Sequence, residues 1–196
     1  HEIRTPMNAV VGFSALARKS NDKELMKNYL EKIKISSDLL LNIVNDILDI
    51  SKVEAGKLVL SHEEFYMNKV CHRINSIFQS QAEGKKLTWE LINNIPESLH
   101  FIGDQVRFEQ IMVNLCSNAL KFTKQGSISI SINMEVLEGM DYHIVVRVKD
   151  TGIGISEEEQ TRLFNAFIQA DDSTSRKFGG TGLGLALSKE ISHLMK

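Results

Sequence analysis

The chain has 196 residues, of which 42% are hydrophobic, so it is long enough to bury the core of one or two domains. Its 23 basic and 25 acidic residues give a net charge of −2, which argues against nucleic acid as the main partner, because phosphate-backbone binding needs a basic excess. Cys71 and Cys116 lie in apolar helical patterns without metal-ligand spacing, so we expect buried thiols rather than a disulfide.

No apolar run reaches the ~18 residues that a membrane span needs, and the N-terminus does not have the pattern of a signal peptide. We therefore expect this segment to be cytoplasmic and without direct membrane contact. A membrane anchor elsewhere in a longer parent protein stays open.

The spacing of apolar residues predicts two helices, over 1–19 and 23–55, separated by the turn sequence Ser20-Asn21-Asp22. In the longer helix, apolar or small residues recur at alternating steps of three and four, which is a heptad seam: Leu30, Ile33, Ser37, Leu40, Val44, Ile47 and Ser51. A short loop makes the pair an antiparallel hairpin. A second copy would cover the seam as a two-fold four-helix bundle, so we expect a homodimer through this hairpin.

After Gly56 the pattern changes, and alternation from Lys57 to Phe65 predicts a strand. Further helices are predicted over 68–82, 105–122, 156–164 and 183–195, and further strands over 87–92, 101–104, 128–136 and 142–149. The last two strands form a hairpin. The fold class is therefore α+β: a helical hairpin over 1–56, followed over 57–196 by an α/β sandwich with an antiparallel or mixed sheet covered by helices on one face.

Two asparagines, Asn114 and Asn118, are four residues apart and share one face of a predicted helix. A carboxamide oxygen is a hard donor that suits Mg²⁺, which completes its shell with water and phosphate oxygens. Lys121, three residues later, can lie beside the same phosphates. On their own, these residues are more typical of a solvated helix surface.

A carboxylate, Asp150, ends a run of alternating apolar residues and precedes Thr151-Gly152-Ile153-Gly154. Because a carboxylate only accepts hydrogen bonds, it can select an amino group such as that of adenine. The glycines let the backbone pass close to a flat ring. Asp-Thr-Gly is also a common turn sequence, so a polar hairpin end is the alternative.

A glycine-rich segment, 179–184, precedes an apolar helix. Backbone amides before a helix N-terminus form an anion site, although a flexible linker has a similar composition. The polar segment 165–178 includes Arg176 and predicts a mobile lid whose cation meets a γ-phosphate. With the two preceding motifs this indicates an ATP site. Neither the P-loop nor the Rossmann fingerprint occurs, so the ATP fold must be of another type.

Five motifs, in order along nearly the whole chain, resemble those of the bacterial sensor histidine kinases, particularly the hybrid type. They are residues 1–6 for the H box, 114–123 for the N box, 150–154 and 180–185 for the two glycine boxes, and 164–167 for the F box. The resemblance implies a dimerisation and phosphotransfer hairpin followed by a Bergerat-type ATP-binding domain. We expect both ends of the segment to continue in a longer protein, which would leave an isolated fragment less stable and weakly active.

The resemblance also implies residue roles. Asn118 would be the principal Mg²⁺ ligand with Asn114 as its helper, and Asp150 would accept a hydrogen bond from the adenine amino group. The other contacts to ATP would come from Lys121 near the phosphates, Phe122, Gly152 and Gly154 around the adenine, Arg176 on the lid, and Gly180, Thr181, Gly182, Leu183 and Gly184 at the phosphates.

The phosphoryl group would pass from ATP to His1, and then to an aspartate of a response-regulator receiver domain, separate or fused. Neutral imidazole is a good nucleophile near pH 7, since its unperturbed pKa is ~6.5. Glu2 would orient the ring and stabilise its developing charge. Glu2 and Thr5 match an E-x-x-T pattern linked in this family to dephosphorylation of the regulator. Pro6 is expected to bend the helix beside His1.

Two alternatives stay open. Related ATPases carry a glutamate that activates water one turn before the metal-binding asparagine, and Asn114 at that position argues against an ATP-driven clamp. Glu109 has the wrong offset for that base. A degenerate module could bind ATP without catalysis, but the intact His1, Asn118 and Asp150 argue against it.

Overall fold

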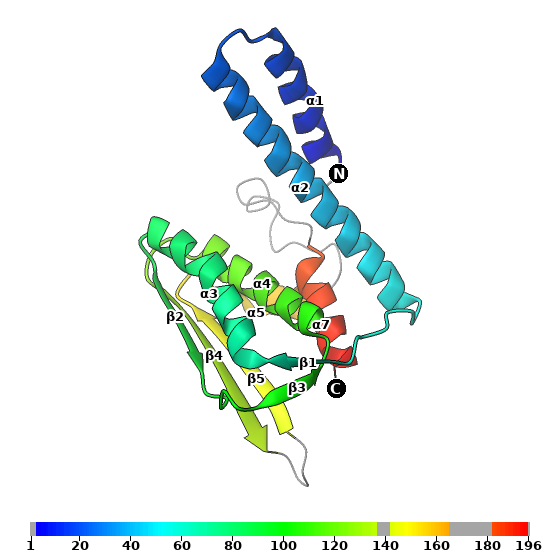
Figure 1. Cartoon of the computed structure of the whole chain (residues 1–196), viewed down its shortest axis with the longest axis vertical. Helices are drawn as coiled ribbons and strands as arrows, with labels where there is room; N and C mark the ends of the chain where they lie inside the picture. The colour runs from blue at the N-terminus through cyan, green and yellow to red at the C-terminus, as the bar shows by residue number, and fades with distance from the viewer. Residues whose placement is uncertain (1–2, 137–141, 165–181, 196) are drawn as a thin grey trace. The chain divides into compact units, whose positions relative to one another are not determined.

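The computed structural model describes residues 3–136, 142–164 and 182–195. The chain divides into two compact units, one built on the residues up to Leu58 and one on Val59 to Phe164. Helix α7 (Gly184–Leu194) is divided between the two units at Ser188. The predicted fold class is confirmed: a helical hairpin precedes an α+β unit (Figure 1). Within the described ranges, no helix combines the length and the hydrophobicity that a membrane crossing requires.

The hairpin consists of α1 (Arg4–Lys19) and α2 (Lys23–Glu54), close to the bounds that the sequence predicts. Asp22 caps α2, because its carboxylate accepts hydrogen bonds from the backbone N–H groups of Glu24 and Leu25 at 2.9 and 3.2 Å. The two helices pack against each other, and the ring of Phe13 stacks on that of Tyr29 with centroids 6.0 Å apart. The hairpin therefore forms within one chain.

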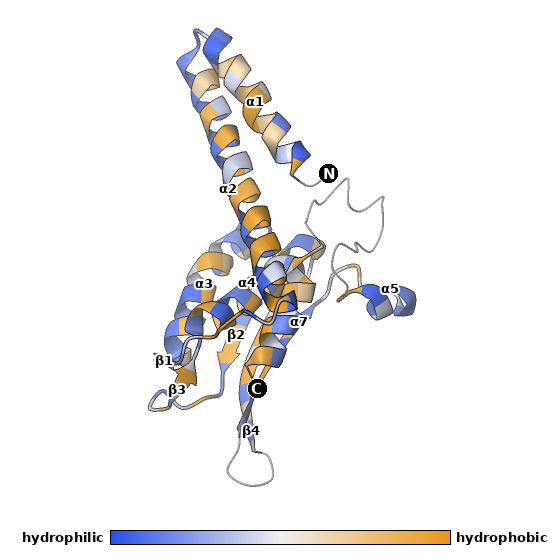
Figure 2. Ribbon diagram, turned by 90° about the vertical axis from the view of Figure 1, so that its right-hand side faces the viewer, coloured by the Kyte–Doolittle hydropathy of each residue, from blue (hydrophilic) through white to orange (hydrophobic). Residues whose placement is uncertain are grey.

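The predicted seam of α2 is covered only in part by the described residues of one chain. Ile33, Leu40 and Ile47 of that seam are half-buried, and Ile43 beside them is buried. A stripe made of two seam residues, Leu30 and Val44, and of Leu41 and Leu48 beside them stays uncovered by the described chain, with side chains between 38% and 61% exposed. Figure 2 shows hydrophobic residues along much of the ribbon of α2, and with the exposed stripe they make up an apolar face. It is wider than the face that α1 can cover, since one helix contacts only one side of another.

The start of α1 leaves apolar side chains uncovered by the described chain. Ile3 and Met7 are exposed, and Pro6 is the buried residue of the first turn. Because α1 as described begins at Arg4, Pro6 lies where its missing N–H would have no helical partner in any case. The predicted bend next to His1 lies outside the described residues.

The sheet of the second unit is mixed. Strand β4 (Ser127–Val136) lies in the middle, parallel to β2 (Thr88–Asn93) and antiparallel to β5 (Tyr142–Asp150). Strands β1 (Glu63–Tyr66) and β3 (His100–Gly103) pair separately as a two-stranded antiparallel sheet. The predicted strand over 57–65 is wrong over 57–62, because the four residues of β3 offer a partner only from Glu63 onward.

The core lies between the mixed sheet and two helices, α3 (Met67–Gly84) and α4 (Gln105–Phe122) (Figure 1). Alternate residues of β4 are buried there, as the period of two predicts: Ile128, Ile130 and Ile132. The helical side contributes Val70, Ile74, Phe78, Met112, Cys116, Ala119 and Leu120. The two cysteines are free and buried, as expected.

Helix α4 is held at its N-terminus by Asp104, which is buried. Its carboxylate accepts hydrogen bonds from the N–H groups of Arg107 at 2.9 Å and Ser61 at 3.0 Å. Burial alone raises the pKa of Asp104, but these hydrogen bonds favour the charged form more strongly, so the pKa is lowered overall. The ionised cap therefore stabilises the start of the helix that carries both asparagines.

Helix α5 (Glu157–Arg162) is shorter than the predicted 156–164. It begins with a capping box, which consists of two reciprocal hydrogen bonds. The Ser156 hydroxyl accepts one from the Glu159 N–H, and the Glu159 carboxylate accepts one from the Ser156 N–H. This local pattern fixes where α5 begins, soon after the Gly152–Gly154 turn.

Candidate functional site

The two asparagines of α4 are both half-buried, but their carboxamides have different surroundings. Asn114 donates a hydrogen bond from Nδ2 to Oγ of Ser188, at 2.8 Å. The carboxamide of Asn118 makes no hydrogen bond to any described residue. Most partly buried amides have hydrogen-bond partners, and Asn118 is an exception among the described residues. Its oxygen and its NH₂ group are therefore available to a ligand.

Asp150 is the last residue of β5, and its backbone is paired in register with that of Ile128 in β4. Its Oδ1 accepts a hydrogen bond from the N–H of Gly152 at 2.8 Å and a longer one from the Thr123 hydroxyl at 3.4 Å. Thr123 follows α4 directly and is buried. The end of β5 and the end of α4 are thus joined at the carboxylate, which orients it.

Gly152 packs against the end of α4 so closely that a side chain does not fit. A Cβ placed there would lie 2.6 Å from the carbonyl oxygen of Phe122 and 2.7 Å from Oδ1 of Asp150. We expected this glycine to admit a flat ring, but its close neighbours are the protein's own backbone and carboxylate. Gly154 has a different requirement, since its φ of +71° is a left-handed conformation that favours glycine.

Sequence reasoning missed two residues that hold this turn. The Thr151 hydroxyl accepts a hydrogen bond from the Ser127 N–H at 3.0 Å and donates to the Gln125 carbonyl at 3.3 Å. Gly126 has a φ of +107°, and a Cβ at this position would collide with the Thr151 hydroxyl. A hydroxyl residue directly after Asp150 was the available signal, but its partners lie more than 20 residues away in sequence.

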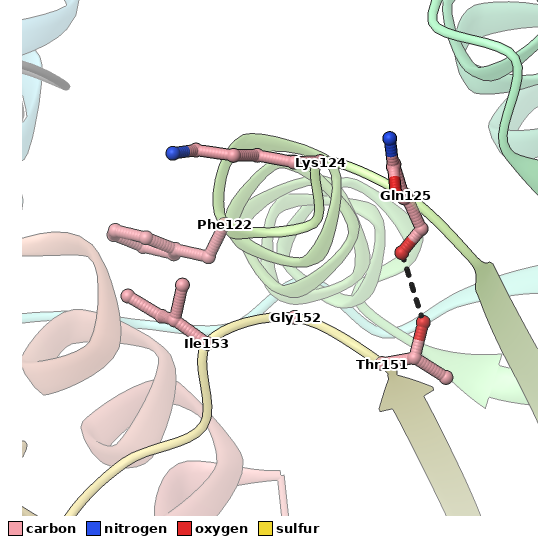
Figure 3. Close-up of a pocket in the computed structure, with 6 residues that line it drawn as sticks. All are labelled: Phe122, Lys124, Gln125, Thr151, Gly152 and Ile153. Atoms are coloured by element: carbon pink, nitrogen blue, oxygen red, sulfur yellow. Dashed lines mark hydrogen bonds between the residues drawn. The ribbon is translucent and has the colours of Figure 1, made fainter.

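A pocket of about 310 Å³ opens at this turn, lined by Phe122, Lys124, Gln125, Thr151, Gly152 and Ile153. The side chains of Phe122 and Ile153 lie on the same side of the Gly152 loop (Figure 3). Two apolar walls beside a turn with polar groups are typical of small-molecule sites. Phe122 and Gly152 are 30 residues apart in the sequence, and both line this one pocket.

Lys121 is half-buried, with its ammonium group 4.7 Å from the centroid of the Phe122 ring. Burial lowers its pKa. Glu109, also on α4, is engaged elsewhere: it forms an ion pair with Arg73 at 2.9 Å and accepts from Gln105 at 2.6 Å. The Glu109 carboxylate is thus engaged by two side chains, one of them a cation.

The glycine-rich segment is described from Gly182 onward. Gly182 has a φ of +65°, Leu183 is buried, and Gly184 begins α7. Backbone N–H groups at the start of a helix suit an anion. Thr5 is exposed in the first turn of α1. The remaining predicted site residues lie outside the described residues: His1, Glu2, Arg176, Gly180 and Thr181.

The described residues contain no group of three or more histidine, cysteine, aspartate or glutamate side chains that could hold a metal ion. A divalent cation in this part of the chain would therefore depend on amide oxygens and on oxygens of its ligand. The unpaired carboxamide of Asn118 meets that requirement.

Comparison with known proteins agrees with this geometry. Residues 1–56 match the His Kinase A (phospho-acceptor) domain, and residues 103–196 match the histidine kinase-, DNA gyrase B- and HSP90-like ATPase. The chain is 41% identical over 197 aligned residues to the signal transduction histidine-protein kinase BarA of Escherichia coli (strain K12), covering 100% of this chain and 21% of BarA. The chain thus spans about a fifth of the length of the curated relatives it matches.

Two solved structures are also similar. Full-length ShkA in complex with AMPPNP superposes with a TM-score of 0.70 and 27% identity, covering 100% of this chain and 39% of ShkA. Histidine kinase ThkA in complex with response regulator protein TrrA gives a TM-score of 0.58 and 27% identity, covering 86% of this chain and 48% of ThkA. With the phosphoacceptor and ATPase matches in the family's order, the chain belongs to the sensor histidine kinases and carries their catalytic core.

Proposed function

We propose that this segment transfers the γ-phosphoryl group of ATP to His1, from which it passes to an aspartate of a response-regulator receiver domain. The observation that carries the proposal is the Asp150 carboxylate, oriented by the Gly152 N–H at 2.8 Å beside the pocket of Phe122 and Ile153. The ATPase match and the AMPPNP in the ShkA complex support the same nucleotide class.

Adenine would bind in the pocket next to Asp150. The hydrogen bonds from Gly152 and Thr123 both go to Oδ1. A carboxylate has about four acceptor positions on its two oxygens, so this anchoring leaves capacity for the adenine amino group. The apolar side chains of Phe122 and Ile153 would cover faces of the ring, and Gly154 would complete the wall.

The metal would be Mg²⁺, held by Asn118 and assisted by Asn114. The fit rests on the unpaired, half-buried carboxamide of Asn118 and on the Asn114 oxygen, which its bond to Ser188 leaves available. When bound, Mg²⁺ offsets negative charge on the phosphates. Lys121, and Arg176 from the lid, would add positive charge, and the amides of residues 180–184 would hold phosphate oxygens.

In the transfer step, an imidazole nitrogen of His1 attacks the γ-phosphorus with its lone pair. A nitrogen–phosphorus bond forms, the bond from the γ-phosphorus to the bridging oxygen breaks, and ADP leaves with that electron pair. The proton on the other ring nitrogen passes to Glu2, which stabilises the positive charge while it develops. A carboxylate oxygen of the receiver aspartate then attacks the phosphorus, the nitrogen–phosphorus bond breaks, and the ring takes back a proton from Glu2 to restore neutral imidazole.

Transfer rather than hydrolysis is favoured by the chemistry of α4. Asn114 stands where a water-activating base would be needed, and a carboxamide cannot take a proton. The nearby carboxylate of Glu109 is paired with Arg73 at 2.9 Å. Water in the site would therefore have no base among these α4 residues, whereas a histidine brings its own nucleophilic lone pair.

The partners proposed for the segment are a second copy and a receiver domain. The exposed stripe of Leu30, Leu41, Val44 and Leu48 would be covered by a second hairpin, as the phosphoacceptor match supports. The ThkA–TrrA complex supports a response regulator as the phosphoryl acceptor. Thr5, which is exposed and lies four residues after His1 in the sequence, would orient water in dephosphorylation of that regulator. We place the segment in the cytoplasm, where ATP is available.

Labelling with [γ-³²P]ATP tests the transfer. We expect label on the protein that is acid-labile and base-stable, absent in His1→Gln, and strongly reduced in Asp150→Asn. Asp38→Asn is the matched control, because this exposed carboxylate pairs only with Lys34 on the surface of α2 among the described residues, and should label normally.

The same assay separates the alternatives. Bound nucleotide without label would indicate a degenerate ATP-binding module. Sustained phosphate release without label would indicate a hydrolytic clamp. Normal labelling of Asp150→Asn would contradict the proposed adenine site even if His1 is the acceptor.

A further inference from the structure

Ser188 is a buried polar residue on a helix face that is otherwise apolar. The buried face of α7 includes Ala186, Leu187 and Ile191, and Ser188 is 7% exposed among them. The described residues contain only four buried polar side chains, and Ser188 is the one on α7. Burying a hydroxyl is unfavourable unless it is hydrogen-bonded, so the serine needs a partner that an alanine of similar size would not.

That partner is Asn114, 74 residues earlier in the sequence. Its Nδ2 donates to Oγ of Ser188 at 2.8 Å, and both residues belong to the second unit. The bond therefore joins the N-box helix α4 to α7 at a position that none of the five motifs includes.

The consequence concerns the orientation of the Asn114 amide. A carboxamide has one oxygen, which can bind a cation, and one NH₂ group, which cannot. Its terminal torsion is broad and roughly two-fold, so an unpartnered amide can turn either group toward a ligand. With the NH₂ group held by Ser188, Oδ1 stays available.

We infer that Ser188 is a positioning residue, which acts through Asn114 to keep that carboxamide oxygen turned toward the Mg²⁺ of bound ATP. The inference rests on the proposed function, because it concerns the metal of the same site. It predicts that the hydroxyl matters for MgATP and not for ATP alone. A hydroxyl with a purely structural role would affect both equally.

The test is calorimetric titration of the 196-residue chain with ATP, once in excess Mg²⁺ and once in EDTA. We expect Ser188→Ala to weaken binding about 3- to 10-fold in Mg²⁺, the loss typical of one hydrogen bond, and less than about twofold in EDTA. Ser192→Ala is the matched control, since Ser192 is an exposed serine one turn later on α7. It should bind as the parent does.

A double-mutant cycle tests whether Ser188 acts through Asn114. In the Asn114→Ala background, Ser188→Ala should weaken MgATP binding no further. Equal losses in Mg²⁺ and EDTA, no loss in either, or losses that add in the double variant would overturn the inference. Melting curves of each variant confirm that binding is measured on folded protein.

These outcomes are separable from failure of the proposed function. A parent chain that binds ATP more tightly with Mg²⁺ but never labels His1 would refute the transfer reaction. The effect of Ser188→Ala on ATP binding in Mg²⁺ and in EDTA would still test the positioning role. A parent chain whose ATP affinity is the same with and without Mg²⁺ would refute both.

Discussion

Replacing Gly152 by alanine tests the geometry of the turn after β5. The added Cβ would lie 2.6 Å from the Phe122 carbonyl oxygen, about 0.8 Å short of ordinary contact at 3.4 Å, and 2.7 Å from Oδ1 of Asp150. The Phe122 carbonyl belongs to the helix backbone and the Asp150 carboxylate is held by hydrogen bonds, so neither group can move away easily. Overpacking of this kind costs about 1–3 kcal/mol, and a loss of 2 kcal/mol lowers the melting temperature of a chain this size by roughly 4–8 °C.

The substitution should also affect nucleotide binding, because it displaces the carboxylate proposed to accept the adenine amino group. Losing one hydrogen bond to a charged acceptor costs about 1.5–3 kcal/mol, which corresponds to an ATP affinity roughly 10- to 100-fold lower. Circular dichroism melting and calorimetric titration with ATP measure the two effects on one sample.

The matched control is Gly84→Ala at the end of α3. A Cβ there meets nothing within 4 Å, and its φ lies outside the left-handed region. We expect Gly84→Ala to keep the parent's melting temperature or raise it slightly, since alanine is the better helix residue. If Gly152→Ala melts and binds ATP as Gly84→Ala does, the close approach of Gly152 to the end of α4 is not a constraint, and our account of this turn is wrong.

Three further predictions concern the helices. Asp104→Ala removes the N-cap of α4 and should cost about 1 kcal/mol at pH 7 by urea denaturation. Because the folded-state pKa of Asp104 is lowered, its contribution is present above the unfolded pKa of ~3.9 and lost as pH falls through the folded value, so a difference that persists unchanged at pH 2 would contradict this role. Burial raises the pKa of Cys71 to about 11 and that of Cys116 to about 12, so thiol reagents at pH 8 should modify neither in the native protein and both in urea; rapid native reaction would contradict their burial. The double change Leu41→Glu with Leu48→Glu should convert a dimer to a monomer in light scattering, whereas a parent that is already monomeric would refute the proposed bundle.

Much of the fold was accessible from sequence because its signals are local. The predicted helix over 105–122 has the bounds of α4, since its apolar spacing and the Asp104 cap both lie within a turn or two of each residue. The strands β4 and β5 agree with their predicted bounds to within one residue at each end, because alternation is a local signal. The strand predicted over 57–65 failed over 57–62, because alternation does not reveal whether a partner strand extends along its whole length.

The candidate site shows the same division. The motif residues Asn118, Asp150 and Gly152 could be named from their types and spacing. Their supporting partners could not, because the Thr123 hydroxyl reaches Asp150 across 27 residues and Ser188 reaches Asn114 across 74. The sequence also explained the glycine at position 152 incompletely. We expected it to make room for a flat ring, but its close neighbours are the Phe122 carbonyl and the Asp150 carboxylate.

The sequence by itself thus determined the elements, the chemical groups available to a nucleotide and the family to which they belong. Those properties follow from side-chain type and from periodicities of two and about 3.6 residues, which neighbours in the chain express on their own. Only the tertiary structure decided that β2 runs parallel to β4, which part of the apolar surface of α2 stays uncovered, and which asparagine is held by a serine and which is free. Each of these depends on segments that meet only when the chain has folded, because residues far apart in the sequence then decide which side chains are buried and which polar groups find a partner.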